Sequence, residues 1–432
     1  MVGSSPGSGM LRQKLGWMGV VTLLPALAAC GESSGAGAAG GGGAGQTAST
    51  GAETSTGSGA GGASGSTSGS GAGAGGASAS TGGAGGTSAS AGGAGGAGTG
   101  GSGGDGTPGA PQGFILGADI SWVQEREAGG KVFRDIDPRT GALVEKDILE
   151  ILKAHGFNWI RLRLFNDPTA VYADAAVDDD PYSREGFCDL EHTIEMARRV
   201  KRANMGFLLD FHYSDVWADP DDQHKPVAWT DLEGGALASA MREFTRDAIE
   251  QLSAAGARPD MVQIGNEIPQ GLLWPDGFVT GQAFQGLGSL LKAGIQGVKD
   301  ADDTITVMLH LDRCDDNAAT RWWVDGVLGQ GVKFDVLGQS CYTEYQGPPS
   351  GWKANFDDLV KRYPDLKFVV AEYSWEKRAA NDLMFNLPDK RGLGTFIWEP
   401  TEWHERIFSP NGDIIESMIA PYDQMKVDYQ GF

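Results

Sequence analysis

From residue 113 to the end of the chain, eight short apolar runs alternate with stretches of helical periodicity. Their starts lie roughly 25 to 55 residues apart, which leaves room for one helix and two loops between successive runs. Short apolar runs separated by helices are typical of buried parallel strands joined by helical crossovers. The runs are 114–121, 159–165, 206–213, 261–267, 304–311, 334–342, 368–373 and 394–398.

Eight βα units in one C-terminal domain predict an α/β fold, the (β/α)₈ TIM barrel, over residues 113–432. The helical stretches support this count. One apolar stripe repeats every three or four residues over 237–252 and stops before Gly256, and Asp189 is placed to cap a helix that stops at Gly206. An open doubly wound sheet would usually carry a Gly-rich phosphate turn after an early strand, and we see none, which favours the barrel.

The first 30 residues have the layout of a lipoprotein signal peptide. Arg12 and Lys14 precede an apolar run over 17–27 that is too short to span a bilayer. The run ends in Leu-Ala-Ala-Cys, which resembles the bacterial lipobox and predicts lipidation of Cys30. An ordinary cleavage site that happens to precede a cysteine remains the alternative. We therefore expect an exported protein, either lipid-anchored to the bacterial cell envelope, displayed at the cell surface, or secreted.

Residues 31–112 consist almost entirely of Gly, Ala, Ser and Thr and show no apolar periodicity. Such a segment cannot bury enough apolar surface to offset the entropy of ordering its backbone, so we expect a disordered tether. Its length could have been selected to let the domain reach its surroundings, or the segment could be a linker whose length is merely tolerated. The formal net charge of −22 argues against nucleic acid as a partner and allows a neutral substrate.

Three cysteines remain after Cys30, an odd number for an exported protein. Cys314 and Cys341 end neighbouring predicted strands, the fifth and the sixth, and are the favoured disulfide pair. The sequence does not determine how they and Cys188 pair.

Polar and aromatic residues gather where the predicted strands end. In a barrel all these ends meet on one rim, where the active sites of this fold are built. Glu267 and Glu372 close the fourth and seventh runs, so their carboxyl groups are placed to flank one bond. Two such carboxylates are the minimum for cleaving a glycosidic bond by double displacement. For each glutamate alone, a structural partner for an arginine or a loop amide is the competing interpretation.

The division of labour between the two glutamates follows from electrostatics. An acid needs a pKa raised by burial or by a second carboxylate, whereas a nucleophile stays ionised beside a guanidinium. Arg161 and Arg163 are the available guanidiniums.

Around these glutamates we expect side chains that bind substrate. Asn266 is placed to donate to a sugar hydroxyl, with a turn residue as the alternative. His212 and His310 could bind substrate or could be core imidazoles whose hydrogen bonds are already satisfied. Asp210 could bind substrate or could be the structural partner of His212. Tryptophans in loops, where no core is available, are placed to stack on sugar rings. The expected set is Asp119, Arg161, Arg163, Asp210, His212, Trp217, Asn266, Trp274, His310, Tyr342 and Trp398.

Metal ligands are not indicated by the sequence. No two histidines have the spacing of a zinc site, and the acidic stretches 178–180 and 219–222 lack the alternation of a calcium loop. These stretches fit solvated faces better.

Longer motifs resemble glycoside hydrolase family 53, the endo-β-1,4-galactanases, over nearly all of 113–432. They are Gly-Ala-Asp-Ile-Ser at 117–121, Arg-Leu-Arg-Leu-Phe-Asn-Asp-Pro at 161–168, Asp-Phe-His-Tyr-Ser-Asp at 210–215 with Trp-Ala-Asp-Pro at 217–220, Gly-Asn-Glu-Ile at 265–268 with Gly-Leu-Leu-Trp-Pro at 271–275, and Trp-Glu-Pro at 398–400.

The resemblance implies a retaining, endo-acting barrel enzyme in which Glu267 is the acid/base and Glu372 the nucleophile. Its implied substrate is β-1,4-galactan, the side chain of type I arabinogalactan and pectin. It implies no organic cofactor. Some members bind structural calcium near the loops after the last two strands, but 373–393 offers no ligand set here. We expect a monomer that contacts a membrane only through its N-terminal lipid.

Two segments depart from the family pattern. The sixth strand reads Gly-Gln-Ser-Cys-Tyr at 338–342 followed by Tyr-Gln-Gly at 345–347, and the segment after the second glutamate reads Tyr-Ser-Trp at 373–375. These positions should line sugar subsites, so we expect the departures to affect the choice of glycan and not the chemistry. Alternatives are a barrel hydrolase for another β-linked plant polysaccharide and a glycan-binding surface lipoprotein without turnover.

Overall fold

The computed structural model describes residues 113–174, 177 and 185–432. The predicted signal peptide with Cys30, the predicted tether 31–112 and the acidic stretch 178–180 lie outside the described residues.

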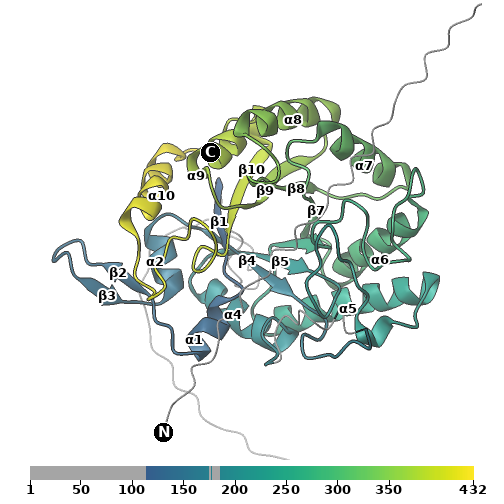
Figure 1. Cartoon of the computed structure of the whole chain (residues 1–432), viewed down its shortest axis with the longest axis horizontal. Coiled ribbons are helices and arrows are strands. Elements are labelled where there is room, and N and C mark those ends of the chain that lie inside the picture. Colours follow the sequence, from purple (N-terminus) through teal and green to yellow (C-terminus); the bar gives the residue numbers. More distant parts are fainter. Residues whose placement is uncertain (1–112, 175–176, 178–184) are drawn as a thin grey trace, which may run out of the picture. The chain divides into compact units, whose positions relative to one another are not determined.

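The C-terminal domain is a closed barrel of eight parallel strands, as the eight apolar runs predicted (Figure 1). Each barrel strand pairs with the next one along the chain, and the last strand pairs with the first to close the ring. Every predicted run overlaps one of these strands. They are β1 Ile115–Asp119, β4 Trp159–Leu164, β5 Gly206–Phe211, β6 Met261–Ile264, β7 Thr306–Leu311, β8 Val336–Ser340, β9 Lys367–Tyr373 and β10 Gly392–Trp398. Strand β9 begins one residue and strand β10 two residues before its predicted run.

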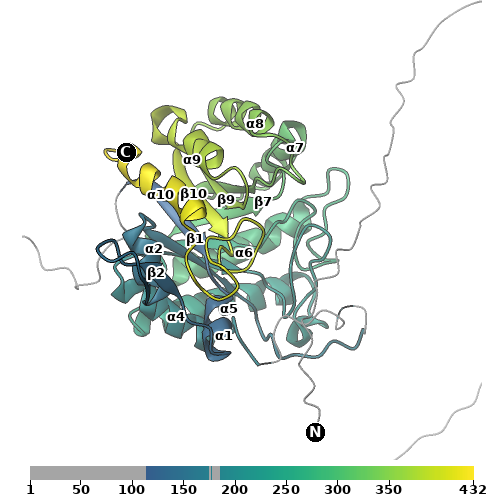
Figure 2. The same ribbon diagram turned by 60° about the vertical axis from the view of Figure 1, so that its left-hand side comes forward.

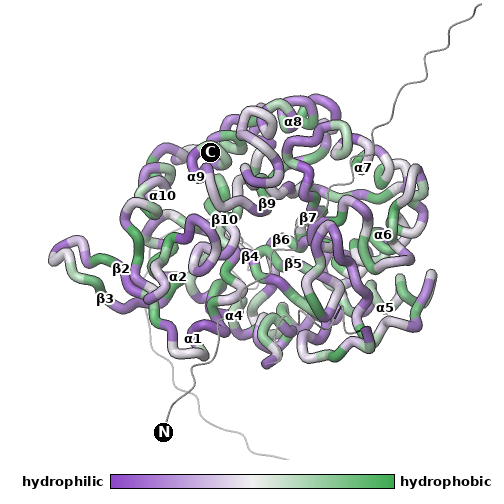
Figure 3. Tube along the Cα trace, viewed as in Figure 1, coloured by the Kyte–Doolittle hydropathy of each residue, from purple (hydrophilic) through white to green (hydrophobic). Residues whose placement is uncertain are grey.

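Helices surround the barrel and cover its outer face (Figure 1). Along these helices hydrophobic and hydrophilic residues alternate, the pattern of a helix with one face on a core (Figure 3). They are α1 Val123–Ala128, α2 Ile148–Ala154, α4 Leu190–Arg202, α5 Gly234–Ala254, α6 Gln285–Ala301, α7 Asn317–Gly329, α8 Pro349–Arg362, α9 Lys377–Phe385 and α10 Glu416–Asp428, with 3₁₀ turns η1 Val227–Trp229 and η2 Pro388–Lys390. In the part of the chain that the structure describes, no helix has both the length and the apolar character needed to cross a bilayer.

The predicted ends of two helices can be compared with the structure. Asp189 caps α4, since its side chain accepts a hydrogen bond of 2.8 Å from the backbone N–H of His192. The same helix ends before Asn204, which takes a positive φ of 52°, so Gly206 is the first residue of β5 and not the helix stop that we expected. Gly256, with φ of 72°, follows α5 as predicted.

A small antiparallel hairpin, β2 Arg134–Ile136 and β3 Leu143–Glu145, was not predicted. Strands of three residues are too short for a period-2 pattern to be recognised. The loop between β10 and α10 lies over one end of the barrel in both ribbon views (Figures 1 and 2), and Asp413 from that loop bridges to Arg134 of the hairpin.

Two apolar cores hold the domain together. The larger lies between the strands and the surrounding helices. The smaller fills the inside of the barrel with one layer of side chains, which we call the lower layer, because it lies toward the N-terminal ends of the strands. The lower layer consists of Ile115, Trp159, Leu208, Met261, Met308, Val336, Val369, Ala371 and Phe396.

The predicted disulfide between Cys314 and Cys341 is confirmed, with Cα atoms 5.2 Å apart. It ties the loop after β7 to the end of β8. Cys188 is buried, with its Sγ 3.6 Å from the carbonyl oxygen of Ser121.

Candidate active site

Polar side chains replace apolar ones inside the barrel toward the C-terminal ends of the strands. Side chains two residues apart on a strand share a face. Because Trp159 belongs to the lower layer, Arg161 also points inward, one step further along β4. The same step leads from Leu208 to Asp210 on β5. We call the resulting set the upper layer: Asp119, Arg161, Asp210, Gln263, His310 and Ser340, all fully buried.

Arg161 is the centre of the upper layer. A guanidinium has five N–H donors, and five acceptors surround this one. Nη1 lies 2.8 Å from Glu372 Oε1 and 3.0 Å from Asp119 Oδ2. Nη2 lies 2.8 Å from Asp210 Oδ2 and 2.9 Å from Asn266 Oδ1, and Nε lies 3.2 Å from Gln263 Oε1. Every donor is therefore engaged by the protein, which makes Arg161 a positioning group and leaves it no surface for the substrate.

Charge balance explains how an arginine can be buried here. Burial alone would lower the pKa of Arg161, but the carboxylates of Asp210, Glu372 and Asp119 outweigh burial and raise it. Burial likewise opposes ionisation of Asp210, yet the adjacent guanidinium keeps the pKa of that carboxyl below its usual value. The cluster is stable as a unit, because removing one partner would leave a buried charge uncompensated.

A β-bulge directs Glu372 into the barrel. On β9, Val370 pairs with Gln339 of β8, but the next pair joins Ser340 to Glu372 and skips one residue. Ala371 and Glu372 consequently both face the interior, whereas strict alternation would have turned the glutamate toward the helices together with Val370.

Glu372 is held by two donors and is only 6% exposed. Besides Arg161, the hydroxyl of Tyr342 donates to its Oε2 over 2.9 Å. Burial raises the pKa of Glu372, but the Arg161 charge and the hydrogen bonds from Arg161 and Tyr342 oppose that rise. Of the two arginines considered from the sequence, Arg161 is thus the one beside this glutamate. Arg163 instead contacts Asp119 over 3.3 Å.

Glu267 lies just beyond β6 and has a different environment. Its backbone adopts a positive φ of 43°, uncommon for a residue with a side chain and frequent at functional sites. Its Oε1 lies 2.5 Å from Ser340 Oγ. Burial, then the negative charges of Glu372 and Asp312, raise the pKa of Glu267 well above its ordinary value. In the described structure no arginine or lysine pairs with Glu267 within 4 Å, in contrast to Glu372.

Ser340 connects the two glutamates. It pairs with Glu372 across the β8–β9 ladder, and its hydroxyl contacts Glu267. The structure therefore brings together the two carboxyl groups that the sequence singled out, with a hydrogen-bonded guanidinium beside one and none beside the other. A pair of carboxyl groups in such different surroundings can act as a proton donor and an ionised nucleophile.

Several predicted substrate-binding residues lie beneath the site. Asp119, Arg161, Asp210 and His310 have no exposed surface in this structure. They contact one another and the groups above them, so their geometry fits positioning better than direct contact with a sugar. Asp210 lies 3.3 Å from His212 Nε2, as the structural-partner interpretation anticipated.

Asn266 is engaged through both ends of its amide. Its Oδ1 accepts from Arg161 and its Nδ2 donates to the carbonyl oxygen of Ala218 over 2.9 Å. The second N–H of this amide is the group that a sugar hydroxyl could accept from, since Asn266 retains 6% exposure.

Three half-buried tryptophans surround Arg163. Its guanidinium carbon lies 4.9 Å from the ring centroid of Trp217, 5.4 Å from that of Trp122 and 5.7 Å from that of Trp398. Two of the three were predicted for sugar stacking, and Trp122 was not. The predicted Trp274 lies elsewhere, packed edge-on against Phe278 at 4.9 Å.

Arg163 also pairs with Glu399, at 2.5 Å from Nη2 to Oε1. Burial raises the pKa of Glu399 to about 8, although the Arg163 charge opposes the rise. The three tryptophans thus pack around the Arg163 guanidinium, whose charge is balanced by Asp119 and Glu399.

Sequence reasoning did not assign roles to Ser340, Gln263 or Trp122. A signal existed for two of them. Ser340 stands two residues before Tyr342 and so shares its face, and Gln263 is a lone polar residue in the apolar run of β6. Trp122 gave no such signal, because it follows β1 in a stretch without periodicity.

The two departures from the family pattern meet in space. The indole N–H of Trp375 donates to Glu344 Oε1 over 2.9 Å, and the His404 ring lies 5.9 Å from the Trp375 ring. The segments after β8 and β9 are therefore joined by a hydrogen bond between Trp375 and Glu344, and Tyr345, next to Glu344 in the chain, is exposed.

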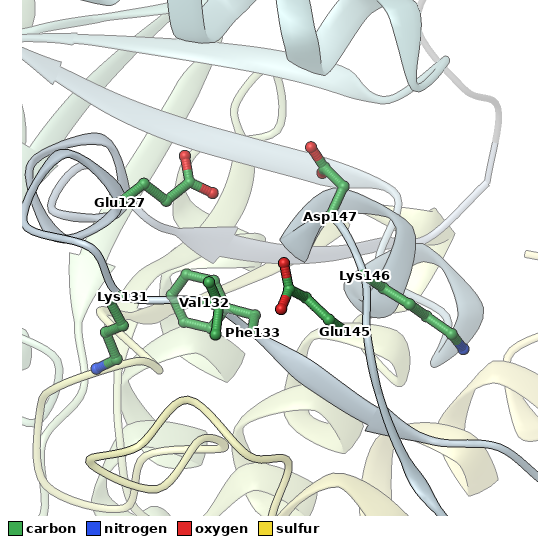
Figure 4. A pocket seen from close by; sticks show the side chains of 7 residues that line it. All are labelled: Glu127, Lys131, Val132, Phe133, Glu145, Lys146 and Asp147. Atoms are coloured by element: carbon green, nitrogen blue, oxygen red, sulfur yellow. The ribbon is translucent and has the colours of Figure 1, made fainter.

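A hollow of about 410 Å³ lies beside the hairpin and contains none of the predicted site residues (Figure 4). Four of its five charged side chains are already paired, and the fifth, Glu145, is exposed. Lys131 bonds to Glu402, Lys146 lies 2.9 Å from Asp135, and Arg199 contacts both Glu127 and Asp147. Among the described residues, no three His, Cys, Asp or Glu side chains are grouped to hold a metal ion.

Comparisons with known proteins agree with this geometry. The model of glycosyl hydrolase family 53 matches residues 115–384, from β1 into α9. An uncharacterized protein of Niallia circulans is 39% identical over 271 residues, 61% of this chain and 69% of the relative. A probable arabinogalactan endo-β-1,4-galactanase A of Aspergillus terreus is 31% identical over 318 residues, 66% of this chain and 84% of the relative. The solved catalytic domain of family 53 from Ignisphaera aggregans superposes with a TM-score of 0.64 and 32% identity, covering 73% of this chain and 97% of that structure.

Proposed function

Because the chain belongs to glycosyl hydrolase family 53, we propose that it is a retaining endo-β-1,4-galactanase acting on galactan and type I arabinogalactan. One observation supports this most strongly. Glu267 and Glu372 share a site, but Glu267 is faced by negative charges whereas Glu372 is bonded to the Arg161 guanidinium. The proposal assigns Glu372 as nucleophile and Glu267 as acid/base.

In the first step, the Glu372 carboxylate attacks the anomeric carbon while Glu267 gives its proton to the leaving glycosidic oxygen. A covalent galactosyl ester forms and the aglycone departs with that proton. In the second step, the Glu267 carboxylate takes a proton from water, the hydroxyl attacks the anomeric carbon, and Glu372 is released as a carboxylate. Arg161 and Tyr342 supply the hydrogen bonds that keep the nucleophile ionised and aligned.

Sugar contacts are proposed for groups that reach the surface of the site. Trp217 and Trp398 are half-buried and present ring surface, and Tyr342 and Asn266 are slightly exposed. Glu344, Tyr345 and Trp375 follow Tyr342 and Glu372 by two or three residues in the chain and are proposed to contact the glycan and influence which sugar is accepted. No metal or organic cofactor is part of the proposal, and hydrolysis should be insensitive to chelator.

The test is hydrolysis of a panel of purified polysaccharides: β-1,4-galactan, arabinogalactan, mannan and xylan. We expect a ladder of β-1,4-galacto-oligosaccharides from galactan, released first as the β-anomer, as followed by proton NMR. Activity on mannan or xylan alone would refute the substrate, single-sugar release would refute endo action, and an initial α-anomer would refute retention.

We also propose that Cys30 carries a lipid that anchors the domain to the cell envelope. The support is the Leu-Ala-Ala-Cys sequence after a short apolar run. Detergent-phase partitioning of the protein expressed with its full N-terminus should be lost in Cys30→Ser. Equal partitioning of both forms would refute the anchor.

A further inference from the structure

A continuous chain of side chains links Arg161 to Glu267. Asn266 Oδ1 lies 2.9 Å from Arg161 Nη2 and 3.0 Å from His310 Nδ1. His310 Nε2 lies 2.9 Å from Ser340 Oγ, which in turn lies 2.5 Å from Glu267 Oε1. Each member of such a chain can only donate or accept at each contact, so fixing one end determines the direction of every bond.

The orientation of Asn266 fixes the first end. Guanidinium nitrogens only donate, so the Asn266 atom facing Arg161 is the carbonyl oxygen. The other amide atom faces the carbonyl oxygen of Ala218 at 2.9 Å, which only accepts. Both contacts require the same orientation, and a flipped amide would create two repulsive pairs.

That orientation determines the tautomer of His310. Asn266 Oδ1 accepts only, so His310 Nδ1 at 3.0 Å carries the proton. Gln263 Nε2 also lies 3.2 Å from Nδ1, but its two protons have acceptors in Gly265 O at 3.1 Å and Asn266 Oδ1 at 3.2 Å. A lone pair on Nδ1 would instead face the Asn266 oxygen without a proton between them.

His310 is neutral in this environment. It is fully buried, and it is faced by the positive charge of Arg161, by the carboxylate of Asp210 and by His212. Burial, followed by the Arg161 charge, lowers the pKa of His310 well below its ordinary value. With its single proton on Nδ1, Nε2 has a lone pair and accepts a hydrogen bond from the Ser340 hydroxyl.

Ser340 has only one proton. To an ionised Glu267 its hydroxyl would donate across the 2.5 Å contact, but with that proton directed at His310 Nε2 its oxygen accepts from a protonated Glu267. We propose that Ser340 and His310 are positioning residues that hold the proton on Glu267 in the resting enzyme, through a chain of hydrogen bonds whose direction is set by Arg161. The proposal rests on the proposed function in one respect, because it explains how the acid/base stays loaded. It gives Arg161 two opposite tasks: it keeps Glu372 ionised by direct contact and Glu267 protonated through the chain.

The chain also describes what changes during turnover. When Glu267 has given up its proton, its carboxylate needs a donor, and the Ser340 hydroxyl can turn from His310 toward it. His310 Nε2 then has no donor, so the chain makes one hydrogen bond fewer when Glu267 is ionised than when it is protonated. This difference favours return of the proton from the attacking water in the second step.

The direct test needs no substrate. In enzyme labelled with ¹⁵N-histidine, long-range proton–nitrogen spectra distinguish a protonated ring nitrogen from an unprotonated one, and the His310 signals are assigned by their loss in His310→Gln. We expect Nδ1 protonated and Nε2 unprotonated throughout the active pH range. A proton on Nε2 would overturn the proposal, whatever the enzyme hydrolyses, so its failure is separable from that of the proposed function.

The second test uses the sign of a shift in the pH profile of kcat/KM, whose basic limb reports the acid of the free enzyme. Glu267 is faced by Glu372, Asp312 and Asp219, which all stay in place in Ser340→Ala. If Ser340 accepts from protonated Glu267, its removal destabilises the neutral acid, and the basic limb moves to lower pH by about 0.5 to 1 unit. A move to higher pH would mean that Ser340 donates to the carboxylate, which overturns the proposal.

The matched control is Ser214→Ala, another fully buried serine, whose Oγ accepts from the Val216 N–H and is not part of the chain. We expect its pH profile to coincide with that of the wild type. If Ser340→Ala does not fold, the histidine spectra of the wild-type enzyme decide the question alone.

Discussion

The lower and upper layers of the barrel interior are built by the same strands, yet they are held together by different forces. Met308 and His310 are two residues apart on β7, and Leu208 and Asp210 are two residues apart on β5. The first member of each pair belongs to an apolar layer, the second to a network of charges and hydrogen bonds.

The contrast shows what each layer can tolerate. Apolar packing is non-directional, so the lower layer needs volume and shape but no particular partner. The upper layer is directional, because each buried charge needs its own counter-charge at hydrogen-bond distance. The barrel thus places the lower layer, in which apolar side chains of similar volume can replace one another, directly beneath the upper layer, in which each group depends on its partners.

The largest expected effect in the upper layer is that of Glu372→Gln. The amide keeps the shape but cannot attack the anomeric carbon, so kcat on galactan should fall by about 10⁴-fold or more, as when other enzymes lose a covalent nucleophile. Calorimetric binding of galacto-oligosaccharides should persist. Glu416→Gln, at the exposed start of α10, is the control with unchanged activity. Turnover within tenfold of the wild type would rule out the assignment of Glu372.

Glu267→Gln should cost less, and the loss should depend on the leaving group. General acids contribute about 10² to 10⁴-fold, and only when the departing oxygen needs a proton. We expect a loss of that size on galactan. Phenol release in the first turnover of a galactoside with an acidic phenol should be much less affected. Equal losses on both substrates would contradict the role of Glu267 as the acid.

Arg161→Met tests the upper layer as a unit. Removing the guanidinium leaves Asp119, Asp210 and Glu372 buried without their shared counter-charge, and breaking a buried ion pair costs about 3 to 5 kcal/mol. Urea denaturation should show this loss in the free energy of unfolding. Arg161→Lys keeps the charge but not the fork, so its loss should be smaller. A loss below about 1 kcal/mol for the methionine variant would contradict the picture of a charge-held layer.

The smallest effect is expected one step lower on β7. Met308→Leu preserves volume in the lower layer, and such swaps usually cost less than about 1.5 kcal/mol. The same denaturation assay should give a value in that range, with kcat on galactan unchanged. A cost that matches that of Arg161→Met would erase the difference between the two layers.

Much of this architecture could be predicted from residues alone. Short, nearly continuous apolar runs separated by helical stretches define buried strands locally, and parallel strands in a closed barrel all present their C-terminal ends on one rim. Glu267 and Glu372 could be paired for that reason, although 105 positions separate them in the chain. The Cys314–Cys341 disulfide followed from the same neighbour relation between strands.

Other features depend on how each strand pairs with both of its neighbours. The bulge that turns Glu372 inward is a property of the β8–β9 and β9–β10 registers and leaves no pattern in β9 itself. Arg161 and Arg163 are two residues apart on β4 and share a face, so alternation along the strand does not distinguish them. Which of the two contacts Glu372 depends on how deep each lies within the barrel. Burial of Asp119, Asp210 and His310 likewise follows only once the ring has closed around them.

The sequence by itself therefore determined the kind of fold, the rim on which the site forms and the two glutamates that we propose to be catalytic, because these follow from the apolar pattern and the chain order. Only the tertiary structure decided which atoms face each other. Hydrogen-bond direction, burial and charge pairing are relations between strands distant in the chain. The different electrostatic surroundings of Glu267 and Glu372 follow from those relations.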